Sequence, residues 1–126
     1  MTGRTDLKMR YLEEEYKALT IIGEQTANSI TLVQRKTDRK IYVKKQISLE
    51  VVTVYNSLKN IVNRNMQRIY DVASDGKKGI VIEEFVNGIT LAEYMEQAGI
   101  LKEAEVCAMI LDLCNALAQI HSSGIV

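Results

Sequence analysis

The 126-residue sequence has no proline, no low-complexity segment and no internal repeat, and its 16 basic side chains are balanced by 16 acidic ones. A chain without net charge creates no overall field that would attract nucleic acid or an anionic membrane. The sequence also lacks an apolar run of the roughly 18 residues that a membrane-spanning helix needs, and its first ten residues are polar rather than signal-like. These absences favour one domain, or one lobe of a larger one.

Cysteine and histidine are also scarce, with two and one residues. Cys107 and Cys114 lie seven residues apart in one helical pattern, which separates them by about 10 Å, too far for a disulfide. We therefore expect two small buried apolar side chains, a reducing compartment and a cytoplasmic location. His121 has no second histidine and no Ser or Cys partner pattern, so a structural role is expected for it. The acidic residues show no metal-ligand spacing, which predicts no metal site.

Runs rich in Ile, Val, Leu and Thr predict five strands, joined mostly by short polar turns. The strands are expected at residues 16–23, 29–35, 41–47, 69–73 and 79–85, with turns at 24–28, 36–40 and 74–78. Short turns between neighbouring strands are typical of an antiparallel sheet.

Helical spacing of apolar residues predicts three helices. The first covers residues 49–62, with Ser48 as its N-cap and Val51, Val54, Leu58 and Ile61 at helical spacing. The second runs from the N-cap Thr90 to about Ala98, and the third covers residues 102–122. The charged stretch at 7–15 is expected as a short helix or a disordered arm. The predicted fold class is therefore α+β, a five-stranded antiparallel sheet with one packed helix, followed by two helices.

The stretch VIEEFVNGITLAEYM at 81–95, with LDLCNALAQIHSSGIV at 111–126, resembles the eukaryotic-like protein kinases, especially the bacterial serine/threonine kinases. The resemblance covers about residues 16–126. It implies an N-terminal arm at 1–15, the small, ATP-binding lobe at 16–86, and the hinge exit and first large-lobe helices at 87–126. In that family the catalytic loop follows HSSGIV, so the chain is expected to be a kinase lobe cut just before it. Whether the full-length parent carries a membrane tether is left open.

The resemblance also assigns the nucleotide site. Backbone groups of Glu84 and Val86 would bind the adenine edge, and Glu83 falls at the gatekeeper position behind it. The glycine-rich loop keeps only Gly23, because Gln25 and Asn28 replace the other two glycines. Glycines let backbone N–H groups approach phosphates, so their replacement is expected to weaken the binding of phosphates by a loop that still covers a pocket. The expected nucleotide-binding residues are Ile22, Gly23, Ile30, Val43, Lys45, Glu84 and Val86.

Strand alternation decides which of two adjacent lysines would contact the phosphates of ATP. Ile41, Val43, Lys45 and Ile47 share one face of the third strand, whereas Tyr42, Lys44 and Gln46 share the other. Because the first set is apolar, it is expected to face the interior and the pocket, which favours Lys45 over Lys44.

The partner of this lysine stays open. Active kinases pair it with a glutamate on the first helix, but alignment places Val54 there. Glu50, one turn earlier, is the only acidic residue in the predicted helix. Either Glu50 serves as the catalytic partner of Lys45, or the ion pair is absent and the parent is a weak or inactive kinase.

The resemblance implies that the full-length parent transfers the γ-phosphate of ATP to Ser or Thr of a protein substrate, with Mg²⁺ bound only in that parent. The 126 residues lack the general base and metal ligands, so no turnover is expected from them alone. Two alternatives are a pseudokinase lobe acting as a scaffold and a small α+β interaction domain that binds no nucleotide. The helix at 102–122 is apolar nearly all round, which favours self-association through it.

Overall fold

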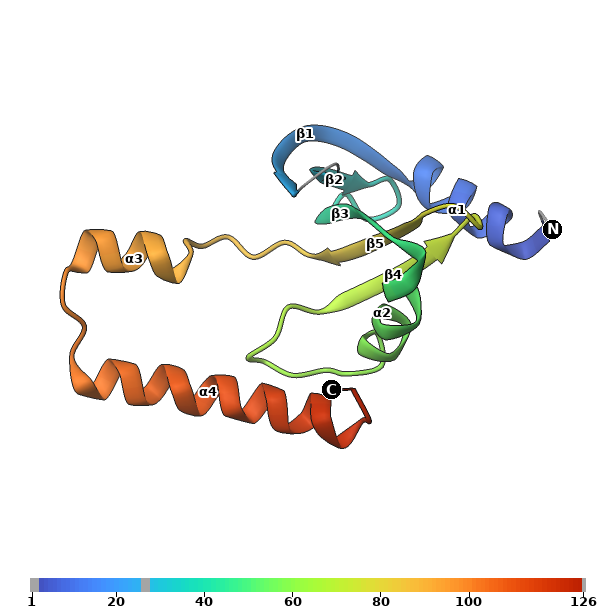
Figure 1. Ribbon diagram of the computed structural model, residues 1–126. Helices are drawn as coiled ribbons and strands as arrows, with labels where there is room; N and C mark the ends of the chain where they lie inside the picture. The colour runs from blue at the N-terminus through green and yellow to red at the C-terminus, as the bar shows by residue number, and fades with distance from the viewer. Residues whose placement is uncertain (1–2, 26–27, 126) are drawn as a thin grey trace.

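The computed structural model describes residues 3–25 and 28–125 and contains a single five-stranded antiparallel sheet (Figure 1). The strands stand in the order β1-β2-β3-β5-β4. They are β1 (Tyr16–Gln25), β2 (Asn28–Arg35), β3 (Ile41–Ile47), β4 (Ile69–Ser74) and β5 (Gly79–Glu84). All five predicted strands and their antiparallel pairing are confirmed. The tip of the expected turn at 24–28, residues 26 and 27, lies outside the described residues.

Four α-helices and one 3₁₀ helix accompany the sheet in the described parts of the chain. They are α1 (Gly3–Glu15), the 3₁₀ helix η1 (Leu49–Val51), α2 (Val52–Leu58), α3 (Leu91–Ala98) and α4 (Glu103–Ser122). The predicted cap of α3 is confirmed, because the hydroxyl of Thr90 accepts a hydrogen bond from the backbone N–H of Glu93 at 3.1 Å. The last helix also matches its prediction within one residue.

The helix predicted at residues 49–62 is shorter in the structure. It begins as the 3₁₀ turn η1, and α2 ends at Leu58. The β-branched run from Val51 to Val54 propagates a helix weakly, and asparagines follow at 60, 63 and 65. Ser48 stands at the N-cap, but its side chain makes no capping hydrogen bond.

The sheet is covered on both faces, rather than by one helix as predicted. On one face, α1 buries Met9 and Leu12 against residues of the strands. The partners in this cluster are Tyr16, Val33, Tyr42, Ala73, Ile80 and Ile82. The stretch expected as a short helix or an arm is therefore helical and part of the core. Tyr42, expected on the less apolar face of β3, is buried because α1 covers that face.

The opposite face is covered by α2. Its side chains Val52, Tyr55 and Leu58 pack against a buried cluster of strand residues, Ile47, Ile69, Val72 and Val81. Val51 and Val54, which belong to the predicted apolar stripe of this helix, are exposed instead. The 3₁₀ start rotates the helix relative to a continuous α-helical count, so that the partly buried stripe that packs on the sheet begins at Val52.

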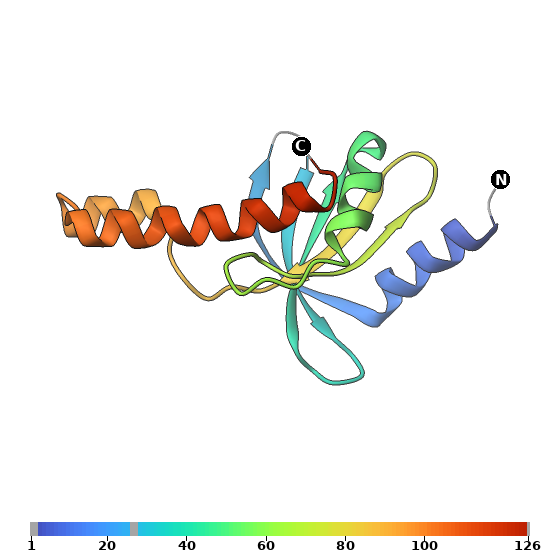
Figure 2. The same ribbon diagram turned by 90° about the horizontal axis from the view of Figure 1, so that it is seen from below.

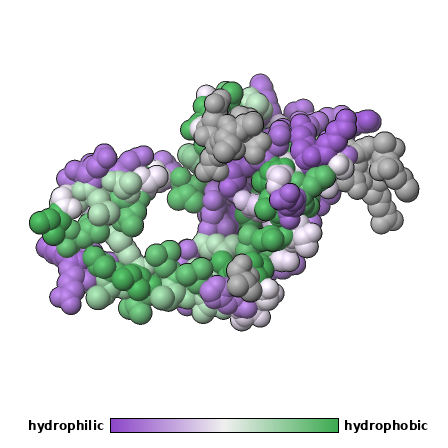
Figure 3. All heavy atoms as spheres, in the orientation of Figure 1, coloured by the Kyte–Doolittle hydropathy of each residue, from purple (hydrophilic) through white to green (hydrophobic). Residues whose placement is uncertain are grey.

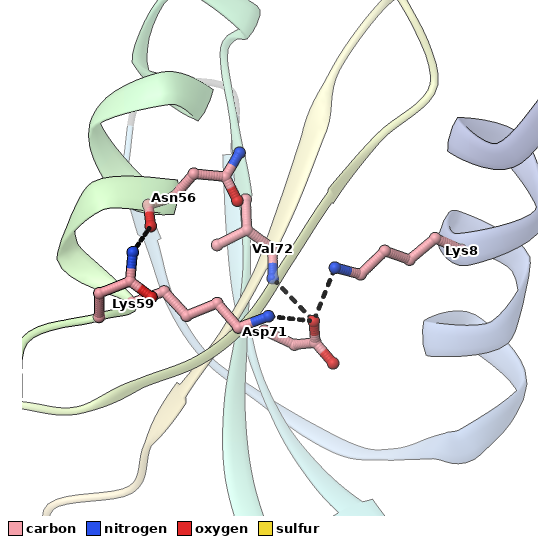
Figure 4. Close-up of polar contacts among 6 residues, drawn as sticks. Lys8, Asn56, Lys59, Asp71 and Val72 are labelled. Atoms are coloured by element: carbon pink, nitrogen blue, oxygen red, sulfur yellow. Dashed lines mark hydrogen bonds and ion pairs between the residues drawn. The ribbon is translucent and has the colours of Figure 1, made fainter.

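One carboxylate on β4 ties both covering helices to the sheet (Figure 4). The Oδ1 atom of Asp71 lies 3.1 Å from Nζ of Lys8 on α1 and 3.3 Å from Nζ of Lys59, just after α2. The same oxygen accepts a hydrogen bond from the backbone N–H of Val72 at 3.2 Å. Asp71 thus connects the two helical layers through the strand between them.

The long helix α4 runs back beneath the sheet and lies beside the loop that follows α2 (Figures 1 and 2). Nδ2 of Asn63 donates to Oδ1 of Asn115 at 3.0 Å and to Oε1 of Gln119 at 2.7 Å, and Nδ2 of Asn65 donates to Oδ1 of Asn115 at 3.2 Å. The hydroxyl of Tyr94 on α3 also donates to Oε1 of Glu105 on α4 at 3.3 Å, and Ala116 of α4 is buried.

Most apolar side chains of α4 are exposed, and they gather along the helix in Figure 3. The exposed set includes Val106, Ile110, Leu111, Leu113 and Leu117. Cys107 and Cys114 were predicted to be buried, but both are exposed free thiols, because α4 is covered on one side only. In the described part of the chain, no helix is long and apolar enough to cross a membrane.

Candidate functional site

The predicted nucleotide residues lie in two adjacent rows across the sheet. In one row, Gly23 pairs with Ile30, and Ile30 pairs with Lys45. In the next, Val43 of β3 pairs with Glu83 of β5. Directly paired residues of antiparallel strands point to the same face. The structure therefore brings Gly23, Ile30, Val43 and Lys45 together on one face of neighbouring strands.

Lys45 makes the central contact of this face. Its Nζ lies 2.8 Å from Oε1 of Glu83 and 5.9 Å from the ring centre of Tyr55 on α2. The Lys45 side chain is 24% exposed, whereas that of Glu83 is 3% exposed. The lysine therefore lies on the face covered by α2 and keeps access to solvent.

The electrostatics of Lys45 follow from this pair. Burial alone would lower the pKa of its ammonium group, because desolvation disfavours the charged form. The hydrogen bond to Glu83 and the negative charge of that carboxylate, with smaller effects from Tyr55, outweigh burial and raise the pKa above its ordinary value. Lys45 therefore stays charged throughout the neutral range.

The predicted ion pair between Lys45 and Glu50 is not formed in the structure. Glu50 lies in the exposed 3₁₀ turn η1, and the carboxylate that contacts Lys45 is Glu83 from β5. Val54, the other position considered, is 40% exposed. The physical reason is the short helix, since α2 carries no acidic residue between Val52 and Leu58 and presents Tyr55 to the lysine instead.

The first hairpin supplies Ile22 and Gly23. The pairing of β1 with β2 shifts register between Ile21 and Gly23, so Ile22 stands at a bulge directly before the glycine. A Cβ atom at Gly23 would lie 3.7 Å from Cδ1 of Ile30, an ordinary contact. Gln25 and Asn28 pair at the end of the hairpin, but the orientation of their side chains lies outside the described residues.

The segment after β5 was predicted as the adenine-binding hinge. The backbone N–H of Glu84 donates to the carbonyl of Arg68 at 2.8 Å, and its carbonyl accepts from Nε2 of Gln67 at 2.5 Å. The backbone of Val86 makes no hydrogen bond with any other described part of the chain, and the residue is 61% exposed. Val86 thus offers a free peptide donor and acceptor, whereas the carbonyl of Glu84 has one lone pair in use.

A pocket of about 470 Å³ adjoins this segment on the side of α4. Its lining includes Glu84 and Val86 but not Lys45 or Val43, so it borders the candidate site without being the same cavity. The lining residues are Arg64, Asn65, Met66, Gln67, Glu84, Val86, Asp112 and Leu113.

Two features of the site were missed by reasoning from the sequence, namely the pairing of Glu83 with Lys45 and the position of Tyr55 over the ammonium. One signal was available, because Glu83 follows the apolar run Ile80–Ile82 on the same face as Val81. A carboxylate in that pattern needs a cation. Among residues 3–25 and 28–125, no group of three or more His, Cys, Asp or Glu could hold a metal ion.

Sequence relatives of the chain are serine/threonine kinases, although no protein-family model matches it. It is 29% identical over 123 residues, 98% of its length, to CBL-interacting serine/threonine-protein kinase 9 of Arabidopsis thaliana. It is 32% identical over 66 residues, 52% of its length, to a probable serine/threonine-protein kinase of Clostridium acetobutylicum. The matches cover 26% and 10% of these relatives, so the chain spans only a small part of each.

The fold is also found in a solved kinase. The chain superposes on Rad53 in complex with AMP-PNP with a TM-score of 0.78 at 19% identity, covering 90% of this chain and 32% of that one. The five-stranded sheet with its helices therefore has the fold of a protein-kinase small lobe, followed by two further helices.

Proposed function

We propose that the chain is the ATP-binding lobe of a serine/threonine protein kinase. The observation that carries the proposal is the position of Lys45. It is a charged, partly exposed lysine on the same face of the sheet as Gly23, Ile30 and Val43. A lysine in this setting can contact the phosphates of ATP, while apolar neighbours contact the base.

The residues present fit such a nucleotide. The free backbone groups of Val86, together with the second lone pair of the Glu84 carbonyl, would hold the adenine edge. Ile22, Ile30 and Val43 would contact the ring, and the ammonium of Lys45 would bind and orient the phosphates. Bound ATP supplies the phosphoryl group. No carboxylate cluster for Mg²⁺ occurs in the described ranges, so we assign no metal ligand to this chain.

The wider assignment follows the kinase relatives. We propose that the full-length parent transfers the γ-phosphate to Ser or Thr of a protein substrate in the cytoplasm. Residues 1–15, 16–86 and 87–126 would form an arm, the small lobe, and the hinge exit with the first large-lobe helices. We propose that the 126 residues alone do not turn over, because no candidate general base or metal ligand is assigned among residues 3–25 and 28–125. The alternative is a pseudokinase scaffold, favoured by the missing loop glycines and the charged Glu83.

ATP binding is the direct test, and two adjacent lysines give a matched pair of variants. ATP is expected to raise the melting temperature of the wild-type chain and to bind in isothermal titration. The K45R variant should lose most of this binding, because a guanidinium keeps the charge beside Glu83 but not the compact geometry of an ammonium. The K44R variant should bind like wild type, since Lys44 lies on the opposite face.

Two results would contradict the proposal. Absence of ATP binding by wild type would favour a scaffold or interaction domain. Equal losses in K44R and K45R would mean that binding does not depend on the proposed face of β3.

We further propose that the exposed apolar side of α4 mediates self-association of the 126-residue chain. Leu111 is 69% exposed on α4, and Leu7 is 63% exposed on α1, so the two offer a matched comparison. L111E is expected to reduce the dimer fraction in analytical ultracentrifugation, whereas L7E should leave it unchanged. A monomeric wild type, or equal effects of both variants, would contradict this proposal.

A further inference from the structure

Glu83 is a charged residue buried in the sheet core. It is 2% exposed as a residue, and its neighbours Val81 and Ile82 on β5 are fully buried. A carboxylate in such surroundings is stable only when a cation and hydrogen bonds compensate for its lost hydration. The cation is Lys45, at 2.8 Å from Oε1.

The two residues are fixed by the sheet itself. Val43 is the direct partner of Glu83, and Lys45 lies two residues further along β3, so the pair is a diagonal neighbour on one face. Diagonal neighbours lie about 7–8 Å apart, within reach of a lysine and a glutamate side chain. Because β3 and β5 are joined by a continuous backbone ladder, this ion pair does not depend on where α2 lies.

No acidic residue of the helix competes for the lysine. Helix α2 has the sequence VTVYNSL, and Glu50 is exposed in η1. Tyr55 approaches the ammonium with its ring instead. We propose that Glu83 is the positioning residue of Lys45, in place of a helix glutamate, and that it holds the ammonium where the phosphates of a nucleotide bind. This inference rests on the proposed nucleotide site and deepens it.

The geometry leaves the lysine free to act. An ammonium has three N–H donors, and the contact with Oε1 of Glu83 uses one of them. With 24% of its side chain exposed, Lys45 can hold Glu83 and a phosphate oxygen together. The charge of Glu83 would then strengthen binding through the phosphates more than binding of the nucleoside.

The test compares E83Q, which keeps the shape of the side chain but removes its charge, with E50Q as the matched control. ATP and adenosine affinities are measured by titration on chains whose folding is checked by circular dichroism. E83Q is expected to weaken ATP binding about tenfold or more, by analogy with the loss in metal affinity when a partner that orients a metal-ligating side chain is removed. Its adenosine affinity should fall much less than its ATP affinity, because E83Q keeps the shape of the side chain behind the adenine, and E50Q should match wild type for both ligands.

Unchanged or tighter ATP binding by E83Q would overturn the inference, as would an equal loss in E50Q. If wild type binds neither ligand, the proposed function fails. The role of Glu83 is then tested separately, by acylation of the Lys45 amine followed by mass spectrometry. Faster acylation of Lys45 relative to Lys44 in E83Q, but not in E50Q, would support positioning by Glu83. Equal rates in all three chains would refute it.

Discussion

Replacing Lys45 by methionine is expected to lower the free energy of unfolding by about 3 kcal/mol, because it leaves the Glu83 carboxylate buried without a cation. Methionine has similar length and fills the space of the lysine stem, so little of this effect would come from lost packing. Glu83 is nearly inaccessible, with 3% of its side chain exposed, and water cannot replace the lost partner without opening the sheet. Urea unfolding followed by circular dichroism measures the change.

Three variants separate the charge effect from other causes. K44M changes the adjacent lysine, on the opposite face, and is expected to alter stability by less than about 1 kcal/mol. E83M leaves Lys45 partly exposed to water, so its effect should be smaller than that of K45M. The double variant K45M/E83M removes both charges and should recover most of the loss, since buried ion pairs can be replaced by apolar residues.

Additive effects in this double-mutant cycle would mean that the two side chains do not interact in solution. The same outcome would remove the basis for a positioning role of Glu83. The expected loss in K45M also explains why K45R is the better variant for testing nucleotide binding, because it keeps a cation beside Glu83.

Local signals in the sequence predict the strands and the helix cap that frame the candidate site. Alternation along β3 places Lys45 and Val43 on the face that α2 covers, because the pleat fixes side-chain direction every second residue. The cap of α3 at Thr90 is equally local, since a hydroxyl and an N–H three residues later suffice. The predicted strands are also confirmed, because they too were predicted from local sequence signals.

Interactions between distant segments are what the sequence did not reveal. The partner of Lys45 is 38 residues away, and nothing near β3 indicates that β5 will deliver a carboxylate to it. The prediction looked to the helix, where Glu50 was the only acidic candidate. Which helix residues face the lysine depends on the 3₁₀ turn η1 before α2 and on where α2 ends. Helix ends are the least certain part of a prediction from sequence patterns.

The role of α1 was missed for a related reason. Its sequence, GRTDLKMRYLEEE, is dominated by charges, and only a few apolar residues indicate a packed face. Two of them, Met9 and Leu12, are buried in a cluster with β-strand residues as far along the chain as Ile82. A short apolar stripe of this kind gains its stability from the sheet that it covers, not from its own helical propensity.

Leu12→Ala is therefore expected to lower the free energy of unfolding of the whole sheet by about 3 kcal/mol. This value is within the range for replacing a buried leucine by alanine, which leaves a cavity in the core. Leu12 is fully buried, in a cluster with Tyr16, Val33 and Tyr42. The matched control is Leu7→Ala on the same helix, which is 63% exposed and should change stability by less than about 0.5 kcal/mol. Chemical unfolding of both variants measures the difference.

The part of the fold in which L12A lowers stability matters as much as the size of the change in the free energy of unfolding. Leu12 packs on the face of the sheet opposite Lys45 and Glu83, so the folded L12A variant should bind ATP as wild type does. If α1 were only an attached arm, L12A would melt the helix and leave the unfolding of the sheet unchanged. A single cooperative transition shifted to lower denaturant would instead mean that α1 and the five strands fold as one unit, because the two faces of the sheet share the same backbone ladder.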